Sequence, residues 1–266
     1  MNGEREERWI GIVRGAHPIS LSPAGLFLVS VVSVIVPVWQ DAEALARTLA
    51  VTDFTGAEII VSSASGDGSL APLRLAQPDI VWVDAPRGRA RQMNAGAAAS
   101  RGDWLVFLHA DTRLPAGWSR AIEAADRDPR VIAGCFRFAL DSRLPIARLI
   151  ELGVRARVAL MGLPYGDQAI FVRRSAFEAL HGYADLPIME DVDLVRRLGQ
   201  RGRLFRSALP AVTSARRWEH DGWIRRTGLH LALILLYFCG VPPARLTRLD
   251  AARRTHPVPS GGRMYL

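Results

Sequence analysis

Residues 102–112 read GDWLVFLHADT and decide the fold class of this chain. The uninterrupted apolar run at 104–108 has no polar face, which is typical of a strand buried on both sides in the middle of a parallel sheet. The run ends in His109 and Asp111, and Pro115 stops its continuation. Ligands of open α/β sheets bind beyond the carboxyl ends of the strands, so Asp111 is expected to face a cleft. A role in capping a helix that starts near Pro115 is an equal alternative for Asp111.

The same kind of run recurs through the N-terminal half. Short β-branched or aliphatic runs predict strands, and Ala-rich stretches predict helices. The expected strands are residues 29–38, 58–61, 80–83 and 104–108, and the expected helices are residues 42–50 and 87–100. Alternation of strand and helix is typical of parallel βαβ units, so we expect an α/β fold with a mostly parallel sheet flanked by helices.

The second half loses this alternation. It predicts strands at residues 132–140 and 168–172, and helices at residues 145–160, 175–180 and 187–197. Residues 229–239 are strongly apolar, but a bilayer requires roughly 20 such residues. Four arginines lie just upstream, so an interfacial helix is one interpretation. A helix docked on the domain or buried in a homodimer is the other.

The composition limits the partners. A chain of 266 residues with 49% hydrophobic content suits one large α/β domain or two small ones. The net charge is +8, yet all 34 basic residues are Arg and they are scattered through every segment. This argues for a compositional bias, and no nucleic acid partner is expected. Cys135 and Cys239 are expected to be buried free thiols in a reducing compartment, which predicts a cytoplasmic protein, at most peripheral at the inner face of the membrane.

Polar or aromatic residues follow each expected N-terminal strand. They are Trp39 with Asp41, residues 62–69, Arg87 to Arg91, and His109 with Asp111. Arginines at a helix start suit phosphate oxygens, and a nearby carboxylate suits Mg²⁺ or Mn²⁺. The expected cleft therefore suits a nucleoside diphosphate. Without Lys no phosphate-binding P-loop can form, and no G-x-G-x-x-G follows the first strand.

Five stretches in consistent order carry a resemblance that covers about residues 30–248. They are VSVIVPVWQD, EIIVSSASGDGS, RGRARQMNAGAAASRGDWLVFLHADT, GDQAIFVRRSAFEALHGY and MEDVDLVRRL. Together they resemble family 2 glycosyltransferases of the GT-A fold. The stretch TSARRWEHDGWIRRTGLHLALILLYFCGV is similar to the bacterial subgroup associated with radical-SAM/selenodomain gene neighbourhoods.

The resemblance implies a Rossmann-like nucleotide-binding sheet with a C-terminal acceptor region. The substrate would be a nucleotide-diphosphate sugar donor, and the acceptor is unknown. The residues that would bind the donor are Pro37, Val38, Trp39, Ser62, Arg89, Arg91, Asn94 and Asp111. Pro37, Val38 and Trp39 would line the base pocket, with Arg91 and Asn94 near the ribose and diphosphate. Ser62 stands where the family usually has a base-recognising carboxylate, which makes a preference for uridine doubtful.

The resemblance also implies a metal and a catalytic base. His109, Ala110 and Asp111 occupy the position of the family's D-x-D motif, so Asp111 and His109 would hold a divalent metal, Mn²⁺ or Mg²⁺. A histidine suits Mn²⁺ better than Mg²⁺. Glu190 and Asp191 match the family's ED motif and are the catalytic residues that the resemblance implies. Asp191 would be the general base of an inverting transferase, which deprotonates the acceptor hydroxyl.

The expected organisation is a peripheral arm at 1–28, a GT-A domain at 29–248 and a tail at 249–266. Within the domain, 29–115 would bind the nucleotide, 116–219 would carry the acceptor and catalytic residues, and 220–248 would hold the apolar helix. Residues 220–240 would supply any peripheral membrane contact. Two alternatives are a nucleotidyltransferase, which would need a Gly-rich loop after the first strand, and a non-catalytic membrane-surface binding protein on the same fold.

Overall fold

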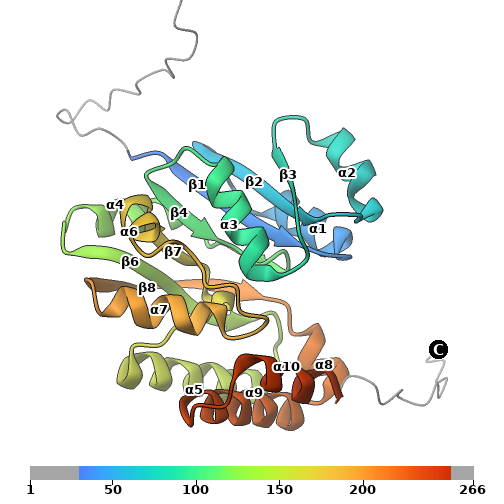
Figure 1. The fold of residues 1–266 in the computed structure, drawn as a ribbon, viewed down its shortest axis with the longest axis vertical. Coiled ribbons are helices and arrows are strands. Elements are labelled where there is room, and N and C mark those ends of the chain that lie inside the picture. The colour runs from blue at the N-terminus through green and yellow to red at the C-terminus, as the bar shows by residue number, and fades with distance from the viewer. Residues whose placement is uncertain (1–29, 253–266) are drawn as a thin grey trace, which may run out of the picture.

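The computed structural model describes residues 30–252 (Figure 1). The expected arm at 1–28 and the tail beyond residue 252 lie outside these residues. The described strands are β1 (Val32–Val38), β2 (Ala57–Ala64), β3 (Val81–Ala85), β4 (Trp104–Phe107), β5 (Thr112–Arg113), β6 (Val131–Leu140), β7 (Ile170–Arg173) and β8 (Arg203–Thr213). They form one eight-stranded sheet in the order β3-β2-β1-β4-β7-β6-β8-β5.

Helices cover both faces of the sheet, and the last helices of the chain lie beyond it at the end of the molecule away from β3 (Figure 1). The α-helices are α1 (Ala42–Val51), α2 (Ala71–Ala76), α3 (Arg89–Ala99), α4 (Trp118–Asp126), α5 (Pro145–Met161), α6 (Arg174–Ala179), α7 (Glu190–Gly199), α8 (Arg216–Asp221), α9 (Trp223–Phe238) and α10 (Pro243–Ala252). Short 3-10 helices are η1 (Gly68–Leu70) and η2 (Gly166–Gln168).

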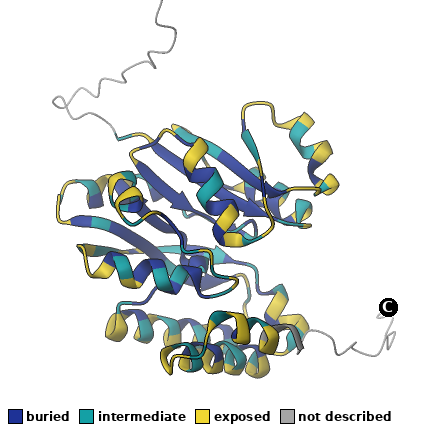
Figure 2. Ribbon diagram, in the orientation of Figure 1, coloured by how far each residue is buried: buried dark blue, intermediate teal, exposed yellow. Residues whose placement is uncertain are grey.

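Strand β4 lies at the centre of the sheet, as the apolar run predicted. It pairs in parallel with β1 and antiparallel with β7. Trp104 and Val106 enter the core on one face of the sheet, whereas Leu105 and Phe107 enter the core on the other face. Figure 2 shows the buried strands of this region between exposed helix surfaces. Burial on both faces explains why the run contains no polar residue.

Strand β8 was not expected from the sequence. Its run contains Arg203, Arg206 and Pro210, which interrupt the alternation typical of a strand. Pro210 lies opposite Arg137 of β6, immediately after a register shift between Cys135 and Arg137. Proline is tolerated in sheets at such irregular positions, because the missing N–H then costs no ladder hydrogen bond.

The expected apolar helix at 229–239 forms part of α9. Leu233 and Ile234 of α9 pack against Met189 and Val192 at the start of α7. Within residues 30–252, no helix combines the length and apolar character needed to cross a membrane. One expectation is wrong: Cys135 is buried, but Cys239 is exposed because it lies just after the last turn of α9.

Candidate active site

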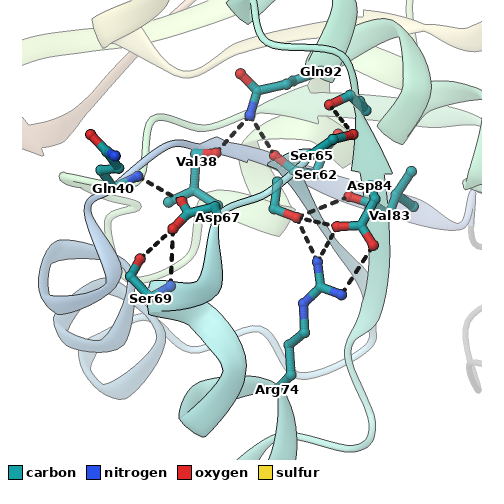
Figure 3. A network of polar contacts seen from close by, with 12 residues as sticks. Val38, Gln40, Ser62, Ser65, Asp67, Ser69, Arg74, Val83, Asp84 and Gln92 are labelled. Atoms are coloured by element: carbon teal, nitrogen blue, oxygen red, sulfur yellow. Dashed lines mark hydrogen bonds and ion pairs between the residues drawn. The ribbon is translucent and has the colours of Figure 1, made fainter.

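The C-terminal ends of β1 and β2 are fixed by one side chain of α3. Pro37 pairs with Ser62, and Val38 with Ser63. Gln92 donates its Nε2 hydrogen atoms to the carbonyl oxygens of Val38 at 2.6 Å and Ser62 at 2.9 Å (Figure 3). The amide therefore binds the two strand ends together at the edge where the sequence predicted a nucleotide.

Ser62 is completely buried, and its Oγ has no hydrogen-bond partner. Its side chain lies beside Gly96 of α3, where an added Cβ would meet Ile35 Cγ2 at 2.5 Å. The glycine therefore permits close packing of α3 on the sheet, and Ser62 occupies that contact. The expected contact of Ser62 with the base stays a prediction.

The turn after β1 is held by the loop after β2. Asp67 accepts hydrogen bonds from the backbone N–H of Gln40 at 2.7 Å and of Ser69 at 3.2 Å (Figure 3). Beside this turn, the guanidinium of Arg87 lies 5.0 Å from the centroid of the Trp39 ring. A half-buried indole with a cation over its face offers a flat surface on which a base can stack.

Arg89, the first residue of α3, forms an ion pair with Glu190, the first residue of α7. Arg89 Nη1 lies 3.1 Å from Glu190 Oε1, and the side chains are 45% and 3% exposed. Burial raises the pKa of Glu190, and Arg89 opposes that effect. Burial lowers the pKa of Arg89, but Glu190 and Asp191 outweigh it and raise the pKa. Arg89 thus stays partly accessible to solvent, while the carboxylate that it pairs with is buried.

Arg91 and Asn94 connect α3 to the segment before α7. Arg91 donates two hydrogen bonds, at 2.8 and 2.7 Å, to the carboxylate of Asp185, and both side chains are exposed. Asn94 donates to the carbonyl oxygen of Tyr183 and accepts from its N–H, both at 2.9 Å. Both side chains thus hold the segment before α7 against α3. Their expected contacts with the ribose and the diphosphate stay predictions.

Asp111 lies between β4 and β5, directly before Thr112, and contacts the C-terminal part of the chain. Its Oδ2 is 3.3 Å from Arg216 Nη2, and its side chain is 13% exposed. Arg216 also donates two hydrogen bonds to the carboxylate of Asp41, which follows β1. Arg216 therefore joins the ends of β1 and β4. Sequence reasoning missed this residue as a site member, and only its place in the resembling C-terminal stretch could have indicated it.

His109 and Asp111 offer one nitrogen and one carboxylate to a cation. Burial, Arg89 and Arg217 lower the pKa of His109 well below its ordinary value, so its imidazole is neutral at pH 7. A neutral imidazole is the form that binds metals. In the described part of the chain, no group of three or more His, Cys, Asp or Glu side chains is placed to hold a metal. The donor set fits a cation only if a substrate supplies further oxygen ligands.

Asp191 is fixed by two backbone N–H groups. Gly166 donates to its Oδ2 at 2.7 Å, and Val192 donates to its Oδ1 at 2.8 Å. Gly166 also borders His109: a Cβ at this position would lie 2.7 Å from His109 Nε2. The candidate base and the candidate metal ligand therefore lie on either side of one glycine.

Asp167 is a further carboxyl group in this region. Its Oδ1 is buried and has no hydrogen-bond partner. Burial raises its pKa to about 6, with further increases from Asp191 and Asp111 and opposing effects from Arg157 and Arg89. The residue comes from η2, at the start of GDQAIFVRRSAFEALHGY, one of the five stretches that carry the family resemblance.

A family model described as glycosyl transferase family 2 matches residues 33–177, more than half of the chain. The chain belongs to glycosyl transferase family 2. The match includes β1, α3 and β4, and with them the donor-binding candidates Trp39, Arg89 and Asp111. It ends before Glu190, Asp191 and Arg216. The family and the glycosyltransferase class of enzyme expected from the sequence are therefore confirmed.

Curated relatives of this glycosyltransferase carry the name pre-mycofactocin glycosyltransferase and come from two strains of Mycobacterium tuberculosis. Each is 29% identical over 219 residues, which cover 75% of this chain and 46% of the relative. The chain thus spans about half the length of these relatives.

Solved structures of Staphylococcus aureus TarS 1-349 share the fold. The structure without a named ligand has a TM-score of 0.52 at 14% identity and covers 70% of this chain and 60% of TarS. The complexes with UDP and with UDP-GlcNAc also have TM-scores of 0.52, at 13% identity. They cover 69% of this chain and 60% and 58% of TarS, respectively. The expected GT-A architecture is confirmed by this likeness.

Proposed function

We propose that this glycosyltransferase transfers a sugar from a nucleotide-diphosphate donor to an acceptor hydroxyl with inversion at the anomeric carbon. One observation carries the proposal: Arg89 pairs with Glu190 beside Asp191, and Gly166, which donates to Asp191, also borders His109, two residues before Asp111. Three separate parts of the chain therefore bring Arg89, Asp111 and Asp191 into one region, where both aspartates raise the pKa of Arg89. A cation, a carboxylate for a metal and an oriented carboxylate are the groups that such a transfer uses. Residues 29–115 would then bind the donor, and residues 116–219 would bind the acceptor.

The donor half, together with Arg216 from the C-terminal part, would supply contacts for the base and the diphosphate of a nucleotide sugar. Trp39 would stack on the base, and Arg89 with Arg216 would bind the diphosphate oxygens, since guanidinium groups form strong bonds to phosphate. The UDP and UDP-GlcNAc complexes of TarS support a donor of this class. Asp111 and His109 would hold Mn²⁺ or Mg²⁺. When bound, such an ion offsets the negative charge on a leaving diphosphate.

Asp191 would act as the base. Two backbone N–H groups orient its carboxylate, and an oriented carboxylate can accept the proton of an acceptor hydroxyl. That oxygen then attacks the anomeric carbon from the face opposite the diphosphate, which inverts the configuration. Glu190 has a different task, because its carboxylate is buried against Arg89 and would hold that cation near the donor.

Replacing Asp191 by Asn tests the proposal. Asp191→Asn keeps the shape but removes the proton acceptor, so turnover should fall by ~10²-fold or more while donor binding stays within about threefold. Calorimetric titration with UDP, GDP, ADP and dTDP, with and without Mn²⁺, measures binding. Product formation is measured first with pre-mycofactocin, the substrate class in the relatives' name. Equal loss of binding and turnover would indicate a structural role for Asp191 and contradict the proposal.

Two further sequence expectations concern one part of the surface. Residues 220–240 were expected to contact a membrane or to form a homodimer interface. Both remain proposals, and both concern α9. The charges around this helix favour the membrane.

A further inference from the structure

The outward faces of α5 and α9 are apolar. On α5, Leu149, Leu152 and Leu160 are 67%, 58% and 86% exposed. On α9, the exposed large apolar residues are Ile224, Leu231, Leu235 and Phe238. Both helices lie at the end of the molecule away from β3, and Figure 2 shows exposed residues along each of them. We refer to these seven residues as the α5–α9 face.

Helical periodicity makes each half of this face continuous. The buried residues of α5 include Ala147, Glu151 and Val158, which lie on one side at helical spacing. At about 100° per residue, Leu149, Leu152 and Leu160 lie on the opposite side, where a surface helix normally carries charged residues. The remaining positions of that stripe are Gly153, Ala156 and Ala159. On α9, Leu231 and Leu235 lie opposite the buried Arg226 and Leu233, and the buried Ile234 marks one edge of the stripe. The exposed small residues Gly228 and Ala232 lie on its other side.

The two helices of this face, α5 and α9, each carry a net positive charge. Arg155 flanks the stripe on α5 and Arg225 flanks it on α9, whereas Arg148 is paired with Glu151 and donates to the carbonyl oxygens of Leu140 and Ser142. The single acid of α5, Glu151, is 6% exposed and paired with Arg148. Helix α9 contains no Asp or Glu. An apolar face bordered by arginines has the chemistry of a helix that lies in the interface of an anionic bilayer.

We infer that the α5–α9 face binds the surface of an anionic lipid bilayer. The apolar side chains would enter the boundary between headgroups and acyl chains, and the flanking arginines would contact lipid phosphates. A second copy of this chain complements the face less well, because it would bring the same arginines against one another. The helices would lie on the membrane, since neither of them can cross it.

This placement would bring the proposed base near the lipid. The inner side of α9 packs on Met189 and Val192, the neighbours of Glu190 and Asp191 in α7. Because a helix with its side chains is about 10–12 Å thick, Asp191 would lie roughly one helix diameter from the headgroups. An acceptor attached to a lipid could then reach it. This consequence rests on the proposed sugar transfer, whereas lipid binding by the face does not.

Vesicle flotation tests the inference on the full chain. Neutral vesicles contain phosphatidylcholine alone, and anionic vesicles also contain phosphatidylglycerol. We expect binding to the anionic vesicles, at least ~10-fold weaker binding to the neutral ones, and weakening by added salt. The double variant Leu152→Glu/Leu235→Glu should lower vesicle binding by at least ~10-fold, because it places two carboxylates in the face. Both residues are exposed, so the fold should survive, which circular dichroism checks.

Leu75→Glu is the matched control. Leu75 is 86% exposed on α2, outside the face, and its variant should bind vesicles as the parent does. Absence of vesicle binding, or equal loss in both variants, would overturn the inference. A lipid-free dimer in analytical ultracentrifugation that dissociates in Leu152→Glu/Leu235→Glu would assign the face to a second copy instead. UDP binding is measured on the same variants and is expected to be unchanged. Loss of vesicle binding with UDP binding intact then concerns the α5–α9 face alone, so failure of this inference is distinguished from failure of the proposed transfer.

Discussion

Gly166 and Asp191 meet through one hydrogen bond, from the glycine N–H to Asp191 Oδ2 at 2.7 Å. The same glycine leaves room for His109, since an added Cβ would lie 2.7 Å from His109 Nε2 and 3.4 Å from Asp191 Oδ2. A backbone group thus positions the proposed base, and the missing side chain lets the imidazole approach it. This arrangement makes Gly166 a sensitive position for activity.

Gly166→Ala should lower kcat more than it changes the KM for the donor. The new methyl group requires a shift of His109 or of the loop, and tight packing costs typically ~1–3 kcal/mol of stability. Steady-state kinetics and thermal unfolding measure the two effects. Gly153→Ala is the control, because Gly153 lies in α5 with open space around it, and Ala there should stabilise the helix by about 0.5–1 kcal/mol. Unchanged kinetics in Gly166→Ala would show that the loop does not position Asp191.

Arg89 and Arg91 should respond differently to replacement, although only Ala90 separates them on α3. Arg89 is held by the buried Glu190 beside Asp191, where it would bind the diphosphate, so Arg89→Ala should weaken UDP binding by ~10-fold or more. Arg91 pairs with the exposed Asp185, so Arg91→Ala should change UDP affinity by less than about threefold. Calorimetric titration with UDP measures the affinity of both variants. An equal loss of UDP affinity in both variants would indicate that Arg91 also contacts the donor directly.

Asp167 should make stability depend on pH. Its pKa is about 6 in the folded protein against 3.8 in the unfolded chain, so the folded state retains the proton longer. Ionisation therefore costs nothing below pH 3.8, reduces stability as pH rises from about 4 to 6, and has its full effect above pH 6. Asp167→Asn should stabilise the protein at pH 7.5 by roughly 1–3 kcal/mol and have little effect near pH 4.

Asp128 provides a control of opposite sign, and denaturant titrations between pH 2 and 7.5 measure the stability of both variants and of the parent. Hydrogen bonds from Arg130 lower its pKa to about 2, so the ionised form is favoured by folding. Asp128→Asn should therefore reduce stability above pH 4, with the difference vanishing as pH falls toward 2. If Asp167→Asn shows the same sign as Asp128→Asn at pH 7.5, the Asp167 carboxylate has a stabilising partner when ionised.

The parts of this fold that the sequence predicted depend on local patterns. Strand β4 was predictable because five consecutive apolar residues leave no alternative to burial on both sides, whereas β8 contains Pro210 and depends on its pairing with β6. The candidate site shows the same difference between local sequence patterns and long-range contacts. Asp111 and Asp191 lie within stretches that the sequence makes recognisable. The contact of Asp111 with Arg216, however, joins residues 105 positions apart. No local periodicity encodes a contact of that range.

Trp39 should carry much of the affinity for the nucleotide base. Its ring lies beside the turn held by Asp67, with the Arg87 guanidinium 5.0 Å from the ring centroid. Stacking of a base on an aromatic ring is worth about 1–3 kcal/mol, so Trp39→Ala should weaken UDP binding by roughly 5- to 150-fold. Trp39→Phe should retain most of the affinity, because a flat ring remains. Titration calorimetry compares the variants, and UDP should quench the tryptophan fluorescence of the parent more than that of Trp39→Phe. Equal affinity in the parent and in Trp39→Ala would place the base elsewhere, since no stacking surface would then have been lost.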